Sequence, residues 1–194
     1  MNIPMKELVI FDLDGTLVDS IADLTTAVNQ ALEKCGWPLH TSDEYRFMVG
    51  DGVLKLFERA LPEGECTEEN VLRIRDLFIP FYEIHNTDLS RPYEGIVELI
   101  GELRSRGVHM AVASNKYHVA TVKIIDHFFG LGTFELVLGN RDGVPRKPEP
   151  TIVNEILERV GVERENTLYV GDTSVDMLTA KNARVDCLAV SWGF

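Results

Sequence analysis

The sequence predicts an α/β fold in which a parallel sheet carries helices on both faces and a helical segment interrupts the first unit. From Pro92 onward, short apolar runs alternate with stretches of helical periodicity, as they do in chains built from βα units. Between about Val18 and Asp88 the periodicity is helical, with no convincing strand. These two observations predict an α/β core with an all-helical insert.

The first element is expected to be a buried strand. Four apolar residues, Leu8–Phe11, run directly into Asp12-Leu13-Asp14-Gly15. A continuous apolar run before a glycine turn is typical of a central parallel strand. Because strand side chains alternate, Asp12 and Asp14 are expected to leave the strand on the same side. Two close carboxylates repel unless a cation compensates them, so this turn is a candidate metal and phosphoryl-transfer site.

The helical insert begins after this turn. Apolar residues from Ile21 to Cys35 follow helical spacing, with Asp19 or Ser20 as N-cap and Gly36 past the end. Helical spacing continues over residues 41–87. The sequence therefore predicts a helical domain of residues 18–88, inserted into an α/β core domain of residues 1–17 and 89–194.

The remaining core elements are bounded by glycines and by changes of period. A helix near residues 96–103 ends at Gly107, and a helix ending at Gly161 follows the third strand. The strands are expected at residues 108–113, 134–138, 167–170 and 187–190, and the other helices at 119–129, 152–160 and 174–183.

Polar residues follow the predicted strands, at the edge where ligands bind in parallel sheets. Ser114 follows the second core strand and can donate a hydrogen bond to a phosphoryl oxygen. Lys147, in a proline-stiffened loop, can keep aspartates ionised and supply positive charge. Asp172 and Asp176 are four residues apart at a helix start, so we expect them on one face.

Composition excludes several classes of partner. The net charge of -12 argues against binding to nucleic acid or to anionic membranes. Three cysteines without a C-x-x-C pair are typical of a reducing compartment, so we expect a cytoplasmic protein. There is no apolar run of about 20 residues and no signal-peptide pattern. The five histidines show no metal-ligand spacing.

Along nearly its whole length the chain resembles the haloacid dehalogenase superfamily, and within it the phosphatases similar to phosphoglycolate phosphatase. The resemblance implies a Rossmann-like core with a helical cap. Four segments are similar to the family's four motifs: Asp12–Leu17, Ser114–Lys116, Lys147–Pro150 and Gly171–Asp176. Two further segments, Val49–Gly52 and Arg91–Gly95, resemble a cap loop that faces the active site and the return from cap to core.

The resemblance implies a Mg²⁺-dependent phosphomonoesterase that acts on a small phosphorylated metabolite like phosphoglycolate. Asp12 would be the nucleophile that forms an aspartyl-phosphate, and Asp14 the acid and base. The metal would be held by Asp12, the carbonyl of Asp14 and Asp172, with Asp176 in support. The phosphate would be bound by Thr16, Ser114, Asn115 and Lys147.

The cap is expected to be mobile and to close over the substrate, with hinges near residues 17–19 and 88–93. Gly50 and Gly52 would form the cap loop that approaches the phosphate site. Two features depart from the family pattern. Arg184 stands where a small residue is usual, and the chain ends at Phe194, where members typically continue with a strand and a helix. We therefore expect a short or truncated member of the family, and either a monomer or a homodimer.

Two other functions remain open at this stage. One is a phosphosugar mutase of the β-phosphoglucomutase type, which has the same core and a similar cap. The other is a non-catalytic phospho-acceptor switch domain, which the Asp-x-Asp-Gly-Thr signature and the large insert disfavour. Turnover of p-nitrophenyl phosphate distinguishes an enzyme from a switch.

Overall fold

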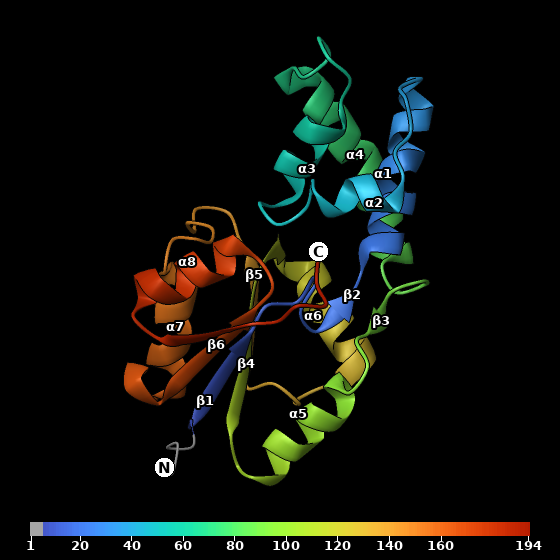
Figure 1. Cartoon of the computed structure of the whole chain (residues 1–194). Helices are drawn as coiled ribbons and strands as arrows, with labels where there is room; N and C mark the ends of the chain where they lie inside the picture. Colours follow the sequence, from blue (N-terminus) through green and yellow to red (C-terminus); the bar gives the residue numbers. More distant parts are fainter. Residues whose placement is uncertain (1–5) are drawn as a thin grey trace.

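The computed structural model describes residues 6–194 and contains a five-stranded parallel sheet (Figure 1). Strand β1 is central and pairs with β4 and β6, as its fully buried apolar run predicts. The α/β fold expected from the sequence is confirmed. In sheet order the strands are β5 (Leu136–Asn140), β4 (His109–Tyr117), β1 (Leu8–Phe11), β6 (Thr167–Gly171) and β7 (Asp186–Ala189).

Helices cover both faces of this sheet because β1 sends alternate side chains to opposite sides. Leu8 and Ile10 pack in one hydrophobic cluster with α7 and α8, whereas Val9 and Phe11 pack in another with α5 and α6. The strands' carboxyl ends are therefore left free to hold a site. The four helices are α5 (Ile96–Ser105), α6 (His118–Phe129), α7 (Thr151–Val160) and α8 (Ser174–Ala183).

Four further helices lie together on the side of the strands' carboxyl ends (Figure 1). They share one hydrophobic cluster, which also includes Ala120 of α6 and contacts Tyr117 and Phe194 of the core. No helix within residues 6–194 is long and apolar enough to cross a membrane. The four helices are α1 (Ile21–Cys35), α2 (Ser42–Arg46), α3 (Val53–Ala60) and α4 (Glu68–His85).

The predicted domain division stays a prediction: a core of residues 1–17 and 89–194 and a cap of residues 18–88. Residues 1–5 of the core lie outside the part of the chain that the structure describes. The two connections between these parts run side by side, since β2 (Val18–Asp19) pairs antiparallel with β3 (Arg91–Pro92). Asp23 of α1 secures the return segment. Its buried carboxylate accepts hydrogen bonds from the backbone N–H groups of Leu89 (3.0 Å) and Ser90 (2.8 Å).

Several expected boundaries were wrong. The segment taken as strand-free from about residue 18 begins with β2, which at two residues is too short for periodicity to reveal. Strand β4 extends to residue 117, with an irregular register after Ala113. Strand β5 starts at Leu136, two residues later than expected. The apolar Phe134 suggested an earlier start, but it lies in the preceding loop, where its buried ring packs edge-on against Phe11 and Phe129.

Arg184 is the one non-glycine residue with positive φ among residues 6–194. It caps the C-terminus of α8 at φ 59°, ψ 43°, a position where glycine is usual, and its side chain is exposed. Arg184→Gly should stabilise the protein by about 0.5–1 kcal/mol, because relief of left-handed strain exceeds the entropy that glycine adds to the unfolded chain.

Thermal unfolding measures this gain, and an increase in Tm of about 1–4 °C is expected. The matched change Arg104→Gly, within α5, should lower Tm instead, since glycine inside a helix is unfavourable. A Tm for Arg184→Gly below that of the parent would contradict the interpretation.

Candidate active site

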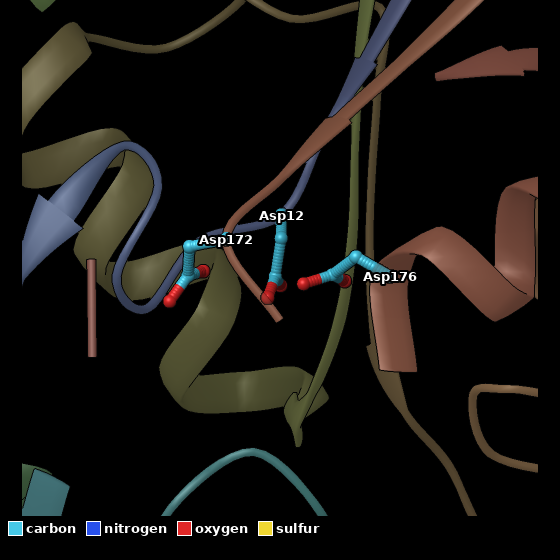
Figure 2. Close-up of side chains that lie close together, drawn as sticks. All are labelled: Asp12, Asp172 and Asp176. Carbon is cyan, nitrogen blue, oxygen red and sulfur yellow. The ribbon is translucent and has the colours of Figure 1, made fainter. Parts of the chain in front are cut away.

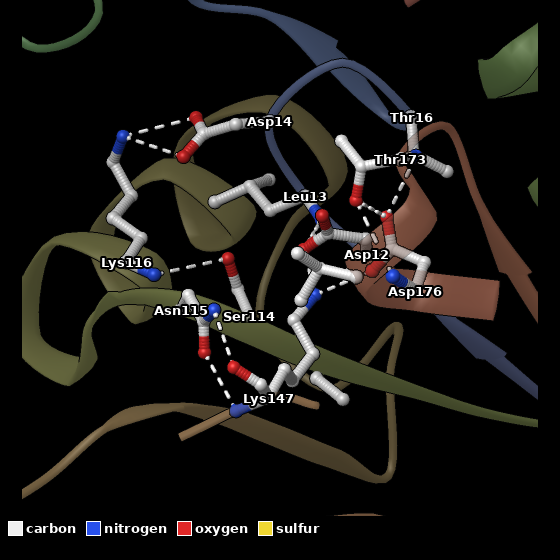
Figure 3. A network of polar contacts seen from close by, with 12 residues as sticks. Asp12, Leu13, Asp14, Thr16, Ser114, Asn115, Lys116, Lys147, Thr173 and Asp176 are labelled. Atoms are coloured by element: carbon white, nitrogen blue, oxygen red, sulfur yellow. Dashed lines mark hydrogen bonds and ion pairs between the residues drawn. The ribbon is translucent and has the colours of Figure 1, made fainter. Parts of the chain in front are cut away.

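The strand ends bring residues from four parts of the chain to one place (Figure 3). Asp12 follows β1, Ser114 lies in β4, Lys147 lies in the loop after β5, and Asp172 follows β6. Carboxylate oxygens of Asp12, Asp172 and Asp176 lie within 4.8 Å of one another, and Figure 2 shows Asp12 between the other two. Three carboxylates in such a group provide the hard oxygen donors that Mg²⁺ and similar cations bind.

Asp12 lies at the centre of this group. Its Oδ1 accepts a hydrogen bond from the backbone N–H of Leu13 (2.7 Å) and forms an ion pair with Nζ of Lys147 (3.0 Å). Within residues 6–194, nothing donates to its Oδ2. Burial raises the pKa of Asp12 to about 7. The charge of Lys147 lowers this pKa, whereas the negative charges of Asp176 and Asp172 raise it further. Without a further cation, this carboxylate is therefore costly to ionise.

Asp176 is held from two sides. Its Oδ1 accepts from Nζ of Lys147 (2.7 Å), and its Oδ2 accepts from the hydroxyl of Thr173 (2.6 Å), the N-cap of α8. Although burial acts to raise its pKa, Lys147 and Thr173 hold it below the usual value. Tyr169 of β6 completes the arrangement, since its hydroxyl lies 3.1 Å from Nζ of Lys147.

Asp172 differs from its expected position. Helix α8 begins at residue 174 with Thr173 as N-cap, so Asp172 precedes the helix and does not share a helical face with Asp176. Its side chain is instead fixed by two donors from distant parts of the chain. The hydroxyl of Thr16 donates to Oδ1 (2.9 Å), and the backbone N–H of Phe194 donates to Oδ2 (3.0 Å).

The charges of this group fit a divalent cation. Three ionised carboxylates and the one ammonium of Lys147 leave an excess of two negative charges. The ammonium of Lys147 is already counted in this sum. Its pKa is well above the usual value, because the charges of Asp12 and Asp176 outweigh the opposing effect of burial. The donor set and the charge are thus both compatible with a metal ion of charge +2.

Asp14 lines the same pocket as Asp12, but its carboxylate does not join the acidic group. Strand β1 ends at residue 11, and its alternation does not continue through the turn. Figure 3 shows the carboxylate of Asp14 directed at Lys116, whose Nζ lies 2.9 Å from Oδ1 and 3.0 Å from Oδ2. The hydroxyl of Ser20 also donates to Asp14. This fixes Asp14 beside the acidic group but outside it.

Ser114 and Asn115 follow Ala113 of β4 at the edge of the site. The hydroxyl of Ser114 accepts from the backbone N–H of Lys116 (3.2 Å), which leaves its proton free for another acceptor. The side chain of Asn115 is fully engaged. Its Oδ1 accepts from the N–H of Lys147 (2.9 Å), and its Nδ2 donates to the carbonyl of Gly50 (3.1 Å).

A pocket of about 60 Å³ lies between these strand ends and the helical segment. Gly50 and Gly52 are among the residues that line it. Both have positive φ (112° and 92°), and a Cβ on Gly52 would come within 3.0 Å of Nη1 of Arg146. The polar residues on the core side of the pocket are Asp12, Asp14, Ser114, Asn115, Lys116 and Thr173.

Sequence reasoning missed two residues that organise the site. Lys116 belongs to the segment Ser114–Lys116 noted in the sequence, but nothing local showed that its ammonium would reach Asp14, 102 positions away in sequence. Thr173 was recognisable in principle, since Thr-x-x-Asp before a helix is a variant of the capping box.

Comparison with known proteins finds one family over most of the chain. A family model described as haloacid dehalogenase-like hydrolase matches residues 9–190. A phosphoglycolate phosphatase of Agrobacterium fabrum is 32% identical over 193 residues, covering 98% of this chain and 83% of the relative. A phosphoglycolate phosphatase of Aquifex aeolicus is 34% identical over 187 residues, covering 96% of this chain and 85% of the relative.

A solved structure shows the same fold. The crystal structure described as a predicted phosphoglycolate phosphatase from Haemophilus somnus superposes with a TM-score of 0.92 at 27% sequence identity. The match covers 100% of this chain and 88% of that one, so it includes the helical segment as well as the sheet.

Proposed function

The chain belongs to the haloacid dehalogenase-like hydrolase family and is a phosphatase, and we propose that it hydrolyses a small phosphate monoester through a covalent phosphate on Asp12. Phosphoglycolate is the first candidate substrate, because relatives that span most of this chain carry its name. The observation that supports this proposal best is the environment of Asp12: one oxygen is tied to Leu13 and Lys147, and the other is left without a donor in the described chain.

In the first step, Oδ2 of Asp12 would attack the phosphorus atom while the bond from phosphorus to the ester oxygen breaks. Asp14, in its protonated form, would give its proton to the departing oxygen, so that the leaving group is released as an alcohol. In the second step, Asp14 would take a proton from water, whose oxygen attacks phosphorus. Inorganic phosphate leaves, and the carboxylate of Asp12 is regenerated.

Lys116 and Ser20 fix the position of Asp14. Both donate to its carboxylate, which holds it next to the pocket and clear of the acidic group. Although burial alone would lower the pKa of Lys116, the charge of Asp14 raises it above its usual value. Lys116 therefore stays cationic and fixes the orientation of the Asp14 carboxylate.

Mg²⁺ is the proposed cofactor, with Asp12, Asp172 and the carbonyl of Asp14 as ligands and Asp176 in support. When bound, it would neutralise charge on Asp12 and on the phosphoryl oxygens. Because both oxygens of Asp176 already accept hydrogen bonds, its part is to keep Lys147 and Thr173 in place.

The proposed phosphate-binding residues divide into two groups. Ser114 has a free proton and lines the pocket, and Lys147 brings positive charge to Asp12, so both can act on the phosphoryl group. Thr16 and Asn115 use their side chains elsewhere: Thr16 holds Asp172, and Asn115 joins the Lys147 loop to Gly50. We assign these two residues to positioning.

Turnover of p-nitrophenyl phosphate tests the proposal. Multiple turnovers that depend on Mg²⁺ are expected from a phosphatase. Labelling of the protein that stops at one phosphate per chain would indicate a phospho-acceptor switch, and conversion of a sugar phosphate into its isomer without release of phosphate would indicate a mutase.

Gly50 tests whether the helical segment acts as a cap that takes part in substrate recognition. Gly50→Leu should lower kcat/KM for phosphoglycolate by about tenfold and that for p-nitrophenyl phosphate far less, because the change strains a loop at the pocket. Gly64→Leu is the matched control, since Gly64 also has positive φ (86°) but no atoms nearby and no place in the pocket. Equal losses on both esters would argue against a cap that recognises substrate.

A further inference from the structure

The pocket has a second wall, opposite the carboxylates, made largely by the helical segment. Most of this wall is apolar, with Leu24, Val53, Leu56 and Phe78 among its residues. Such a wall suits the carbon skeleton of a small substrate but provides no specificity for polar atoms. Any polar group on this wall therefore stands out as a candidate for recognition.

Two tyrosine side chains on this wall have hydroxyls without hydrogen-bond partners. Tyr82 of α4 is 1% exposed, and Tyr117 is the last residue of β4; both line the pocket. Within residues 6–194, neither hydroxyl has an acceptor for its proton, and the group that approaches the hydroxyl of Tyr82, the ammonium of Lys116, is itself a donor. Buried phenols usually find a partner, because an unpaired polar group is costly away from water. These two hydroxyls therefore point to a ligand that supplies the missing acceptor.

Lys116 provides positive charge at the same place. Its Nζ lies over the ring of Tyr82, 4.9 Å from the centroid, and its charge acts on both phenols. The cations of α3 are already paired and do not line the pocket: Lys55 with Glu58, and Arg59 with Asp51. Lys116 is also paired, with Asp14 (2.9 Å), but it is the one cation among the residues of the described chain that line the pocket.

Both phenols act as donors near neutral pH. Burial raises the pKa of Tyr117 to about 12 and raises that of Tyr82 further, although Lys116 opposes both shifts. Two neutral O–H groups and one ammonium can all donate, and the matching partner is a group with several acceptor lone pairs and a negative charge.

We propose that Tyr82, Tyr117 and Lys116 form the subsite for an oxyanion on the leaving group of the substrate, namely a carboxylate on a short carbon chain. This inference rests on the phosphatase function proposed above and adds its specificity-determining residues. A second phosphate has similar acceptor chemistry, and the experiment separates the two.

The test compares kcat/KM for three esters of similar length: 2-phosphoglycolate, ethyl phosphate and propane-1,3-diol bisphosphate. Tyr82→Phe and Tyr117→Phe each remove one hydroxyl and keep the ring, including the stacking of Tyr82 on Phe78. Each should lower the ratio of kcat/KM for phosphoglycolate to that for ethyl phosphate by about 10- to 100-fold, the usual effect of losing a hydrogen bond to a charged group.

Tyr45→Phe is the matched control. Tyr45 is a fully buried tyrosine of the helical segment, but its hydroxyl donates to Asn29 and does not line the pocket. Loss of the Tyr45 hydroxyl should leave the ratio of kcat/KM for phosphoglycolate to that for ethyl phosphate unchanged.

An unchanged ratio in both tyrosine variants, or equal losses on both esters, would overturn the subsite while leaving the phosphatase function intact. A preference for the bisphosphate that falls in the variants would overturn the carboxylate assignment. A parent protein that hydrolyses neither these esters nor p-nitrophenyl phosphate would overturn the subsite and the proposed function together.

Discussion

Asp12→Asn is expected to lower kcat by at least about 10³-fold, because an amide cannot attack phosphorus and form the covalent intermediate. The size of the side chain is kept, and the donors at Oδ1, Leu13 and Lys147, still have an acceptor. Steady-state turnover of p-nitrophenyl phosphate measures the loss.

Stability provides the control for this variant. In the absence of metal, the buried Asp12 is costly to ionise, so Asp12→Asn should have a Tm equal to or above that of the parent at pH 8. Asp76→Asn, an exposed change on α4 far from the pocket, should affect neither turnover nor Tm. A folded Asp12→Asn variant that keeps more than a few per cent of the parent's kcat would exclude Asp12 as the nucleophile.

Removal of divalent metal is expected to abolish turnover, and Mg²⁺ should restore it. The physical reason is the excess of two negative charges left by Asp12, Asp172, Asp176 and Lys147. Full activity after exhaustive treatment with EDTA would contradict this prediction.

The same prediction has a readout that does not depend on activity. Because burial raises the pKa of Asp12 from 3.8 to about 7, the metal-free folded protein keeps a proton that the unfolded chain loses, and stability falls as pH rises between these values. Metal competes with that proton, so the increase in Tm caused by Mg²⁺ should be larger at pH 8 than at pH 5.5. Asp172→Ala should remove most of this increase, and an increase that persists in it would argue against Asp172 as a ligand.

Much of the fold could be predicted because its signals are local. The apolar run of β1, the glycines that follow α1, α5 and α7, and the helical spacing of the insert each lie within a few turns of chain. The pairing of β2 with β3 could not be predicted, since two residues have no period. The burial of Phe134 from a loop likewise made the start of β5 look earlier than it is.

For the candidate site, the sequence predicted which residues lie close together but not which partners their side chains have. That Asp12, Ser114, Lys147 and Asp172 approach one another follows from the rule that parallel strands end at one edge. Which partner each side chain has does not follow, because it depends on contacts between distant segments. Thr16 donates to Asp172 across 156 positions, so a hydroxyl expected at the phosphate is engaged elsewhere.

The pocket wall was the least predictable part. The spacing of the aromatic residues of α4 is typical of core residues, and Phe78 does pack in the hydrophobic cluster of the helical segment. Tyr82 belongs to the same cluster but also reaches the pocket beside Lys116, which depends on how the helical segment sits on the strand ends. Helical periodicity shows which face is buried, but not what it is buried against.

The central claim is that phosphate passes through the carboxylate of Asp12, and trapping that intermediate tests it most directly. The protein is mixed with excess p-nitrophenyl phosphate and Mg²⁺, quenched in acid within milliseconds, and reduced with borohydride, which converts an acyl phosphate of aspartate into homoserine. Peptide mass spectrometry then locates the modified residue. We expect homoserine at position 12, and none there when substrate is omitted. Turnover without modification at position 12, or modification at another aspartate, would contradict the account.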